Sequence, residues 1–126
     1  MRATFDTNIL VDYLNGVPAA KEELTRFDER LVSVVTWMEV MVGATAGEEE
    51  QVARAFLAGF VLVPIDAGVA DEAVRLRRAR RLRLPDAVIW ATARTQHAVL
   101  VTRNTKDFPA TDVGIRVPYR LKADAP

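Results

Sequence analysis

The chain lacks several features that whole classes of protein require. There is no cysteine among its 126 residues, which excludes disulfide frameworks, thiolate zinc sites and thiol nucleophiles. The single histidine, His97, has no partner motif, so a Ser-His-Asp hydrolase is disfavoured, and we expect His97 near a helix end. Gly-rich phosphate loops of the GxxxxGK(S/T) or GxGxxG type are also absent.

Long apolar runs and a net charge are missing as well. Because no segment approaches the length of a membrane span and no basic-then-apolar leader is present, we expect a soluble, cytoplasmic protein. Its 17 basic and 17 acidic residues cancel, so only a local patch could attract nucleic acid. Half of the residues are hydrophobic, and the length fits one domain over 1–126.

Apolar and polar segments alternate in a way that predicts strands separated by helices. Short apolar runs predict strands at 2–5, 31–35, 61–63, 98–102 and, as a further candidate, 115–117. Helical patterns and start signals predict helices at 9–14, from Pro18 onward, at 36–44, 48–59, 66–81 and from Pro85 to His97. This alternation is typical of an α/β fold, with helices on both faces of a parallel sheet.

Three acids fall beside the ends of these elements. Asp6 follows the first strand, Glu39 lies one turn after the second, and Asp86 opens the helix that leads into the fourth. Sites in parallel sheets form beyond the carboxyl ends of strands, so these acids can meet. Clustered carboxylates repel one another and call for a cation, and oxygen ligands without His or Cys favour Mg²⁺ or Mn²⁺. Such ions activate water for attack on a phosphodiester.

Each acid also has a purely structural interpretation. Asp6 could cap the helix that follows it, and Asp86 could be an ordinary helix-start acid. Thr36-Trp37-Met38-Glu39 matches the capping-box pattern, which taken alone favours a structural role for Glu39. The occurrence of all three acids at comparable places favours a site.

Four segments carry a family resemblance, in order and over nearly the whole chain. They are FDTNIL at 5–10, SVVT at 33–36 leading to Glu39, LPDAVI at 84–89 with ATA at 91–93, and LVTRN at 100–104 with KDF at 106–108. In these segments the sequence resembles the PIN-domain nucleases, in particular the VapC-type toxins of type II toxin–antitoxin pairs.

The resemblance implies a three-layer α/β/α PIN-like domain around a central parallel sheet of four to five strands. It implies a Mg²⁺-dependent, or Mn²⁺-dependent, endoribonuclease toxin that cuts single-stranded or looped RNA. It also implies a homodimer and a cognate VapB-type antitoxin that blocks the site. The family's metal ligands correspond to Asp6 and Asp86, with Glu39 as the third acid.

Two positions depart from the family pattern. Where the family often has a fourth acid after the fourth strand, this chain has Asn104, and the first acid is Asp107. Which of the two takes that role, and whether a second metal binds, stays open. Trp90 stands where the family usually has a small residue, and we expect it to fill core rather than narrow a groove. The expected catalytic and supporting residues are Asp6, Glu39, Asp86 and Asn104, with Thr7, Asn8, Thr102 and Asp107 in support.

A run of arginines from Arg75 to Arg83 allows two interpretations. Its cations suit the C-terminal end of a helix and a solvated face, but they could also contact RNA phosphates or an antitoxin. The missing fourth acid also leaves an alternative function, a catalytically weak PIN-like protein-interaction module. A receiver-like signalling domain is disfavoured because paired acids at the first strand and a late lysine loop are not evident.

Overall fold

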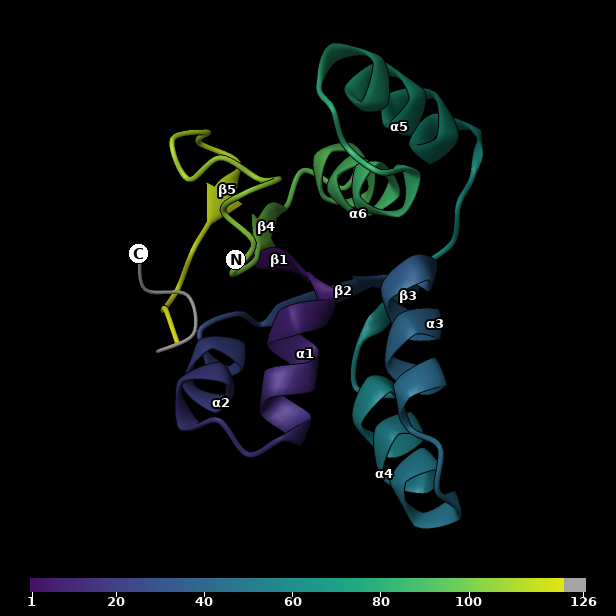
Figure 1. Ribbon diagram of the computed structural model, residues 1–126, viewed down its shortest axis with the longest axis vertical. Coiled ribbons are helices and arrows are strands. Elements are labelled where there is room, and N and C mark those ends of the chain that lie inside the picture. Colours follow the sequence, from purple (N-terminus) through teal and green to yellow (C-terminus); the bar gives the residue numbers. More distant parts are fainter. Residues whose placement is uncertain (122–126) are drawn as a thin grey trace.

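A sheet of five parallel strands, in the order β3-β2-β1-β4-β5, forms the centre of the computed structural model (Figure 1). The structure describes residues 1–121. The strands are β1 (Arg2–Phe5), β2 (Glu29–Ser33), β3 (Val61–Val63), β4 (Val99–Val101) and β5 (Ile115–Arg116). The first strand of the chain is thus the central one, with β2 and β4 beside it. This arrangement confirms the predicted α/β fold and its parallel sheet.

Six helices cover the sheet within residues 1–121. They are α1 (Thr7–Leu14), α2 (Pro18–Thr25), α3 (Val34–Gly43), α4 (Gly47–Leu57), α5 (Ala67–Ala79) and α6 (Leu84–Thr95). Pro18 and Pro85 stand in the first turns of α2 and α6, as predicted from the fixed φ of proline. In this part of the chain, no helix has the length and apolarity that crossing a membrane requires.

Two apolar clusters form the core. In one, α5 and α6 pack with β4 and β5; in the other, α1 to α4 pack with β1, on the opposite side of the sheet in Figure 1. Trp90 lies in the first cluster with 1% of its surface exposed, and its ring meets Phe108 edge to face at 5.6 Å. The expectation that Trp90 fills core is therefore confirmed.

The predicted boundary between the second strand and the third helix is wrong by two residues. Val34 and Val35, whose branched side chains indicated a strand, form the first turn of α3. Ser33 starts this helix, since its hydroxyl accepts a hydrogen bond from the Val35 amide at 3.1 Å. Thr36 is consequently not a cap, and the capping box that it would form with Glu39 does not exist.

His97 lies just beyond the end of α6, as predicted, in a conformation that few residues adopt. Its φ is +53°, and the exposed residue turns the chain from α6 toward β4. Histidine, like asparagine, is among the side chains that enter this left-handed region more often than others. The observed geometry supports a structural role for His97 at the turn.

Candidate active site at the carboxyl edge of the sheet

Asp6 is the centre of the site because β1 is the central strand and ends directly before it. Its side chain is 5% exposed and accepts three hydrogen bonds, all from uncharged donors. The Thr102 hydroxyl and the Thr7 amide donate at 2.7 Å each, and the Asn8 amide group donates at 3.1 Å. The bond from Thr7 also caps α1, so Asp6 fulfils the structural interpretation while its second oxygen faces the edge.

Burial changes the acidity of this carboxyl. Removal from water raises the pKa of Asp6 to about 6, against the hydrogen bonds from Thr102 and Thr7, which lower it. The negative charges of Asp86 and Glu39 raise the pKa further. The three predicted acids therefore lie within electrostatic reach of one another, and together they create a region of unbalanced negative charge.

Glu39 approaches the site from α3. Its carboxylate accepts a hydrogen bond of 2.6 Å from the Thr7 hydroxyl, which also lies 3.2 Å from the Thr36 hydroxyl. Thr36 is completely buried, so the contact between the two hydroxyls fixes the position of Thr7. With the capping box excluded, Glu39 is held through a residue adjacent to Asp6, although its side chain is exposed to solvent.

Asp86 enters from the first turn of α6, where the positive end of the helix dipole favours an acid. The residue is 7% exposed, and its Oδ2 atom accepts a hydrogen bond from Arg83 Nε at 3.2 Å. In contrast to Asp86, the Arg83 side chain is 78% exposed. Asp86 therefore lies near Asp6 and Glu39 and is paired with the exposed guanidinium of Arg83.

The loop after β4 completes the edge. The buried Thr102 hydroxyl bonds to Asp6 and accepts from the Asn104 amide at 2.9 Å. Asn104 and Asp107 hold each other: the Asn104 side chain donates to Asp107 at 2.9 Å and accepts from its amide at 3.2 Å. The two candidates for the fourth-acid position thus form one unit, and neither contacts Asp6 directly in these bonds.

The donor set fits a hard divalent cation. The side chains around the edge offer carboxylate, hydroxyl and amide oxygens, and Asp6 is buried without a cationic hydrogen-bond partner in the described chain. Within residues 1–121, however, no three His, Cys, Asp or Glu side chains converge closely enough to form a metal site by themselves. Mg²⁺ needs no such cage, because it commonly binds through one or two carboxylates and completes its shell with water and substrate phosphate.

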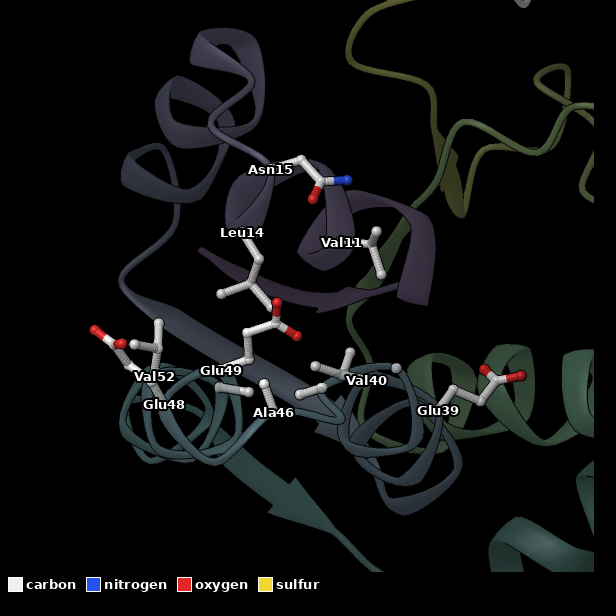
Figure 2. A pocket seen from close by; sticks show the side chains of 12 residues that line it. Val11, Leu14, Asn15, Glu39, Val40, Ala46, Glu48, Glu49 and Val52 are labelled. Atoms are coloured by element: carbon white, nitrogen blue, oxygen red, sulfur yellow. The ribbon is translucent and has the colours of Figure 1, made fainter.

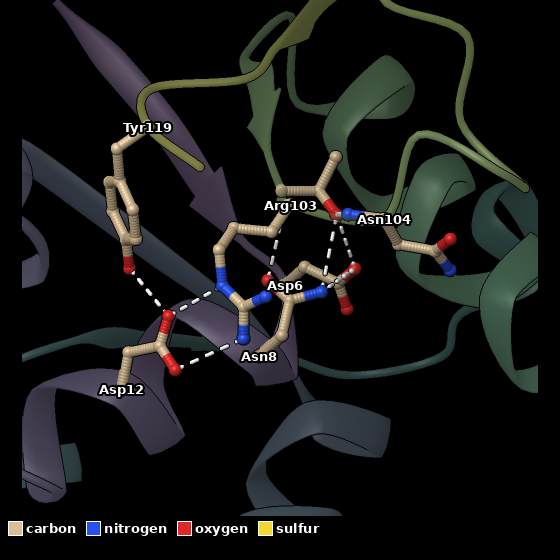
Figure 3. A network of polar contacts seen from close by, with 7 residues as sticks. Asp6, Asn8, Asp12, Arg103, Asn104 and Tyr119 are labelled. Carbon is tan, nitrogen blue, oxygen red and sulfur yellow. Dashed lines mark hydrogen bonds and ion pairs between the residues drawn. The ribbon is translucent and has the colours of Figure 1, made fainter. Parts of the chain in front are cut away.

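A further set of polar contacts, next to Asp6, joins α1 to the loop after β4 (Figure 3). Buried Asp12 on α1 accepts two bonds from the Arg103 guanidinium, at 2.6 and 3.1 Å, and a third from the Tyr119 hydroxyl at 2.7 Å. The backbone amide of Arg103 donates to Asn8 at 3.1 Å, one helical turn before Asp12. Helix α1 therefore binds both the backbone and the side chain of Arg103, and these bonds fix the positions of its chain neighbours Thr102 and Asn104.

This network was missed by the sequence analysis. Its members are separated by about a hundred positions in the chain, and each one alone is an unremarkable polar residue. The only local signal was the spacing of Asn8 and Asp12, which puts both side chains on one face of a helix.

An apolar groove of about 550 Å³ runs between α1, α3 and α4 (Figure 2). Val11, Val40 and Val52 are among its lining residues. Glu39 lies at one end of the groove and Glu48 at the other, so the groove leads from the acidic edge along the helices. Val11 and Val52 are 38% and 54% exposed, so part of the apolar lining of the groove is open to solvent.

The arginine run is partly structural. Arg77 donates to the Leu82 carbonyl, Arg75 pairs with Glu72 at 2.9 Å, and Arg80 stacks over the Trp90 ring at 4.7 Å. These contacts support the interpretation as a helix end with packed cations. Contact of this run with RNA or an antitoxin stays a prediction.

Comparison with known proteins places this fold. The family model of the PIN domain matches residues 3–114. Ribonuclease VapC10 of Mycobacterium tuberculosis is 33% identical over 129 residues, with 96% of each chain covered. The tRNA(fMet)-specific endonuclease VapC of Shigella flexneri is 27% identical over 119 residues, covering 86% of this chain and 90% of its own.

A solved structure gives the same result. A toxin–antitoxin complex from Klebsiella pneumoniae contains a chain with 43% identity and a TM-score of 0.88, and the match covers 94% of this chain and 99% of that one. The FitAcB structure from Neisseria gonorrhoeae, at 23% identity and a TM-score of 0.78, shows the same fold. From the order of its strands, the residues at their carboxyl edge and these matches, we conclude that the chain belongs to the PIN-domain family.

Proposed function

We propose that this protein is an endoribonuclease toxin that hydrolyses RNA phosphodiester bonds and is neutralised by a cognate VapB-type antitoxin. The observation that carries this proposal is Asp6, a buried carboxyl beside Asp86 and Glu39 that only uncharged donors contact within residues 1–121. The ribonuclease and toxin–antitoxin names of its relatives support the same activity.

Asp6 and Asp86 would hold the cofactor, Mg²⁺ or Mn²⁺. A bound divalent ion supplies Lewis-acid stabilisation of phosphate charge and lowers the pKa of water that attacks phosphorus. Glu39 lies on the other side of Thr7 from Asp6, where its carboxylate can orient that water and accept its proton. The two aspartates and Glu39 therefore have different tasks.

The neighbouring polar residues set the geometry. Thr102 and Asn8 fix one oxygen of Asp6 and Thr7 fixes the other, so the carboxylate cannot rotate away from the edge. Asn104 and Asp107 lie in the loop after β4, next to Thr102. There the Asn104 side-chain amide can contact water or the RNA backbone without adding charge.

The exposed apolar surface fits a partner. The groove between α1, α3 and α4 is lined by apolar side chains together with Glu48 and Glu49, and Glu39 lies at one end, so a segment of the antitoxin bound there would reach the active site. Further exposed apolar side chains, Met38 and Val42, suit association of two copies into a homodimer. Light scattering at micromolar concentration that finds only a 14.0 kDa species would contradict the dimer.

The cellular location that we propose follows from the RNA substrate. An enzyme that cuts cellular RNA needs access to the cytoplasm, and we propose that location.

The decisive experiment measures cleavage and metal binding on one preparation. Purified protein should cut a fluorescein-labelled single-stranded RNA in Mn²⁺ and not in excess EDTA, and crystals soaked in Mn²⁺ should show anomalous density between Asp6 and Asp86. The alternative, an interaction module with little catalysis, draws on Asn104 in place of a fourth acid. Protein that binds its antitoxin but cuts no RNA at saturating Mn²⁺ would establish that alternative.

A further inference from the structure

Arg83 pairs with an acid of the candidate site, and its environment differs from that of the arginines in the run that pair elsewhere. Its Nε atom lies 3.2 Å from Asp86 Oδ2, across the first turn of α6. Asp86, Asp107 and Glu39 all act electrostatically on its guanidinium and raise its pKa. Arg83 therefore faces acids delivered by three parts of the chain: α3, α6 and the loop after β4.

The bond to Asp86 is easily exchanged. The Arg83 side chain is 78% exposed, and exposed ion pairs contribute little to stability because water and salt compete with them. A guanidinium carries five N–H donors in a planar fork, a geometry that suits the paired oxygens of a phosphate. The same side chain can thus leave a carboxylate and bind an RNA phosphate with better geometry.

We propose that Arg83 is a phosphate-binding residue that rests on Asp86 in the metal-free protein and moves to the RNA backbone when a divalent cation takes its place. The inference rests on the proposed function, because Asp86 must bind the metal for the exchange to occur. Arg83 and the metal then compete for one carboxylate, while the metal and RNA support each other's binding. The active site gains affinity for RNA only when it is loaded for cleavage.

The neighbouring arginines provide a matched control. Arg75 and Arg94 pair with Glu72, and Arg77 donates to the Leu82 carbonyl. Arg80 pairs with Asp112 and stacks over Trp90. Arg81 lies two residues before Arg83, is exposed, and makes no hydrogen bond or ion pair within residues 1–121. Arg81→Gln removes the same charge as Arg83→Gln from nearly the same place, but it leaves Asp86 undisturbed.

The first experiment measures the affinity for Mn²⁺ by the loss of its free-ion EPR signal, in the absence of RNA. Arg83→Gln should bind Mn²⁺ about two- to fivefold more tightly than wild type, the size expected when an exposed ion partner is removed. Arg81→Gln should show a clearly smaller change. Equal changes in both variants would mean that net charge alone is responsible and would overturn the proposal.

The second experiment is a double-mutant cycle on RNA binding in EDTA, where no cleavage occurs. Asp86→Asn should raise the affinity for a short fluorescein-labelled single-stranded RNA, both by removing a negative charge and by releasing Arg83. If Arg83 is released, the gain should fall by at least about twofold when Arg83→Gln is also present, but not with Arg81→Gln. The same gain in all three backgrounds would overturn the proposal.

The two levels of failure are separable. If wild-type protein binds no Mn²⁺, the proposed metal-dependent function itself fails. If wild-type protein binds Mn²⁺ but Arg83→Gln and Arg81→Gln behave alike in both experiments, the proposed function stands and only the role of Arg83 is wrong. In the Asp86→Asn background, where Arg83 is released, Arg83→Lys keeps the charge and should retain the salt dependence of RNA binding, whereas Arg83→Gln should reduce its slope by about one.

Discussion

Asp6 directly precedes α1 and Asp12 lies within it, and each is 5% exposed, yet the protein treats their charges in opposite ways. Asp12 receives the two-point bond of Arg103 and the hydroxyl of Tyr119, so a cation within the fold compensates its charge. Asp6 receives only an amide N–H, a hydroxyl and a side-chain amide among the described residues. Glu23 follows the Asp12 pattern, paired with Arg116 and Arg26.

The difference distinguishes a structural acid from a functional one. A buried carboxylate that only supports the fold is cheapest when a cation and good hydrogen bonds accompany it. Neutral donors hold Asp6 in place without removing its charge, so folding leaves a site that attracts a cation from solution. Such unbalanced burial is a physical sign of function, and it is independent of any family comparison.

The largest expected effect is the loss of RNA cleavage when an acid of the candidate site is replaced. Asp6→Asn and Asp86→Asn should each lower Mn²⁺-dependent RNA cleavage by at least about a thousandfold, because each removes a negative charge from the proposed metal site. Asp71→Asn, an exposed acid on α5, is the matched control and should cut at the wild-type rate. Initial rates on a labelled RNA at saturating Mn²⁺ test this, and wild-type activity in Asp6→Asn would refute the mechanism.

Asp12→Asn should instead mainly lower stability. The change removes the buried carboxylate that accepts two bonds from the Arg103 guanidinium and one from the Tyr119 hydroxyl, and we expect a loss of about 2 to 4 kcal/mol in the free energy of unfolding. Urea unfolding followed by circular dichroism measures this loss. If Asp12→Asn proved as stable as wild type, the contrast between the two acids would lose its energetic basis.

Glu39→Gln comes next in size. Glutamine can still accept the hydrogen bond from Thr7, so stability should stay within about 1 kcal/mol of wild type. Cleavage should fall by at least about a hundredfold, since the neutral amide cannot take a proton from water. A melting curve and a rate from one preparation decide the matter, and full activity in a folded variant would leave a two-acid site.

The smallest effect concerns pH. The pKa of Asp6 is raised from 3.8 to about 6 in the folded protein, so the folded state binds the proton more tightly than the unfolded state. Ionised Asp6 therefore destabilises the metal-free fold, with no penalty below about pH 4 and the full penalty of about 2 to 3 kcal/mol above about pH 6. In EDTA, the stability of Asp6→Asn relative to wild type should increase across this window. A constant difference would show that burial does not perturb Asp6.

Most of the fold could be predicted from the sequence because short apolar runs and proline positions report local structure directly. The prediction was wrong at Val34 and Val35, where side-chain type favoured a strand but the Ser33 hydroxyl started a helix. A capping bond of this kind competes with propensity by only about 1 kcal/mol, so the pattern of apolar residues cannot resolve it.

The site was predictable in its acids and not in their connections. Asp6 and Asp86 stand beside the ends of elements, and Glu39 follows β2 within α3, so their positions along the chain pointed to one edge of the sheet, where the topology brings their charges together. The bonds from Thr7 to Glu39 and from Thr102 to Asp6 join positions 32 and 96 residues apart. No local pattern encodes such pairs, and the role of Arg83 also depends on where three separate segments meet.

The position of β1 has a consequence for protein synthesis. The central strand β1 is synthesised long before its partner β4 and before the Thr102 hydroxyl that holds Asp6. The core of a nascent chain therefore stays incomplete until β4 has been made. Fragments that end before β4 lack both the strand and the hydroxyl, so interrupted translation yields products without an assembled catalytic edge.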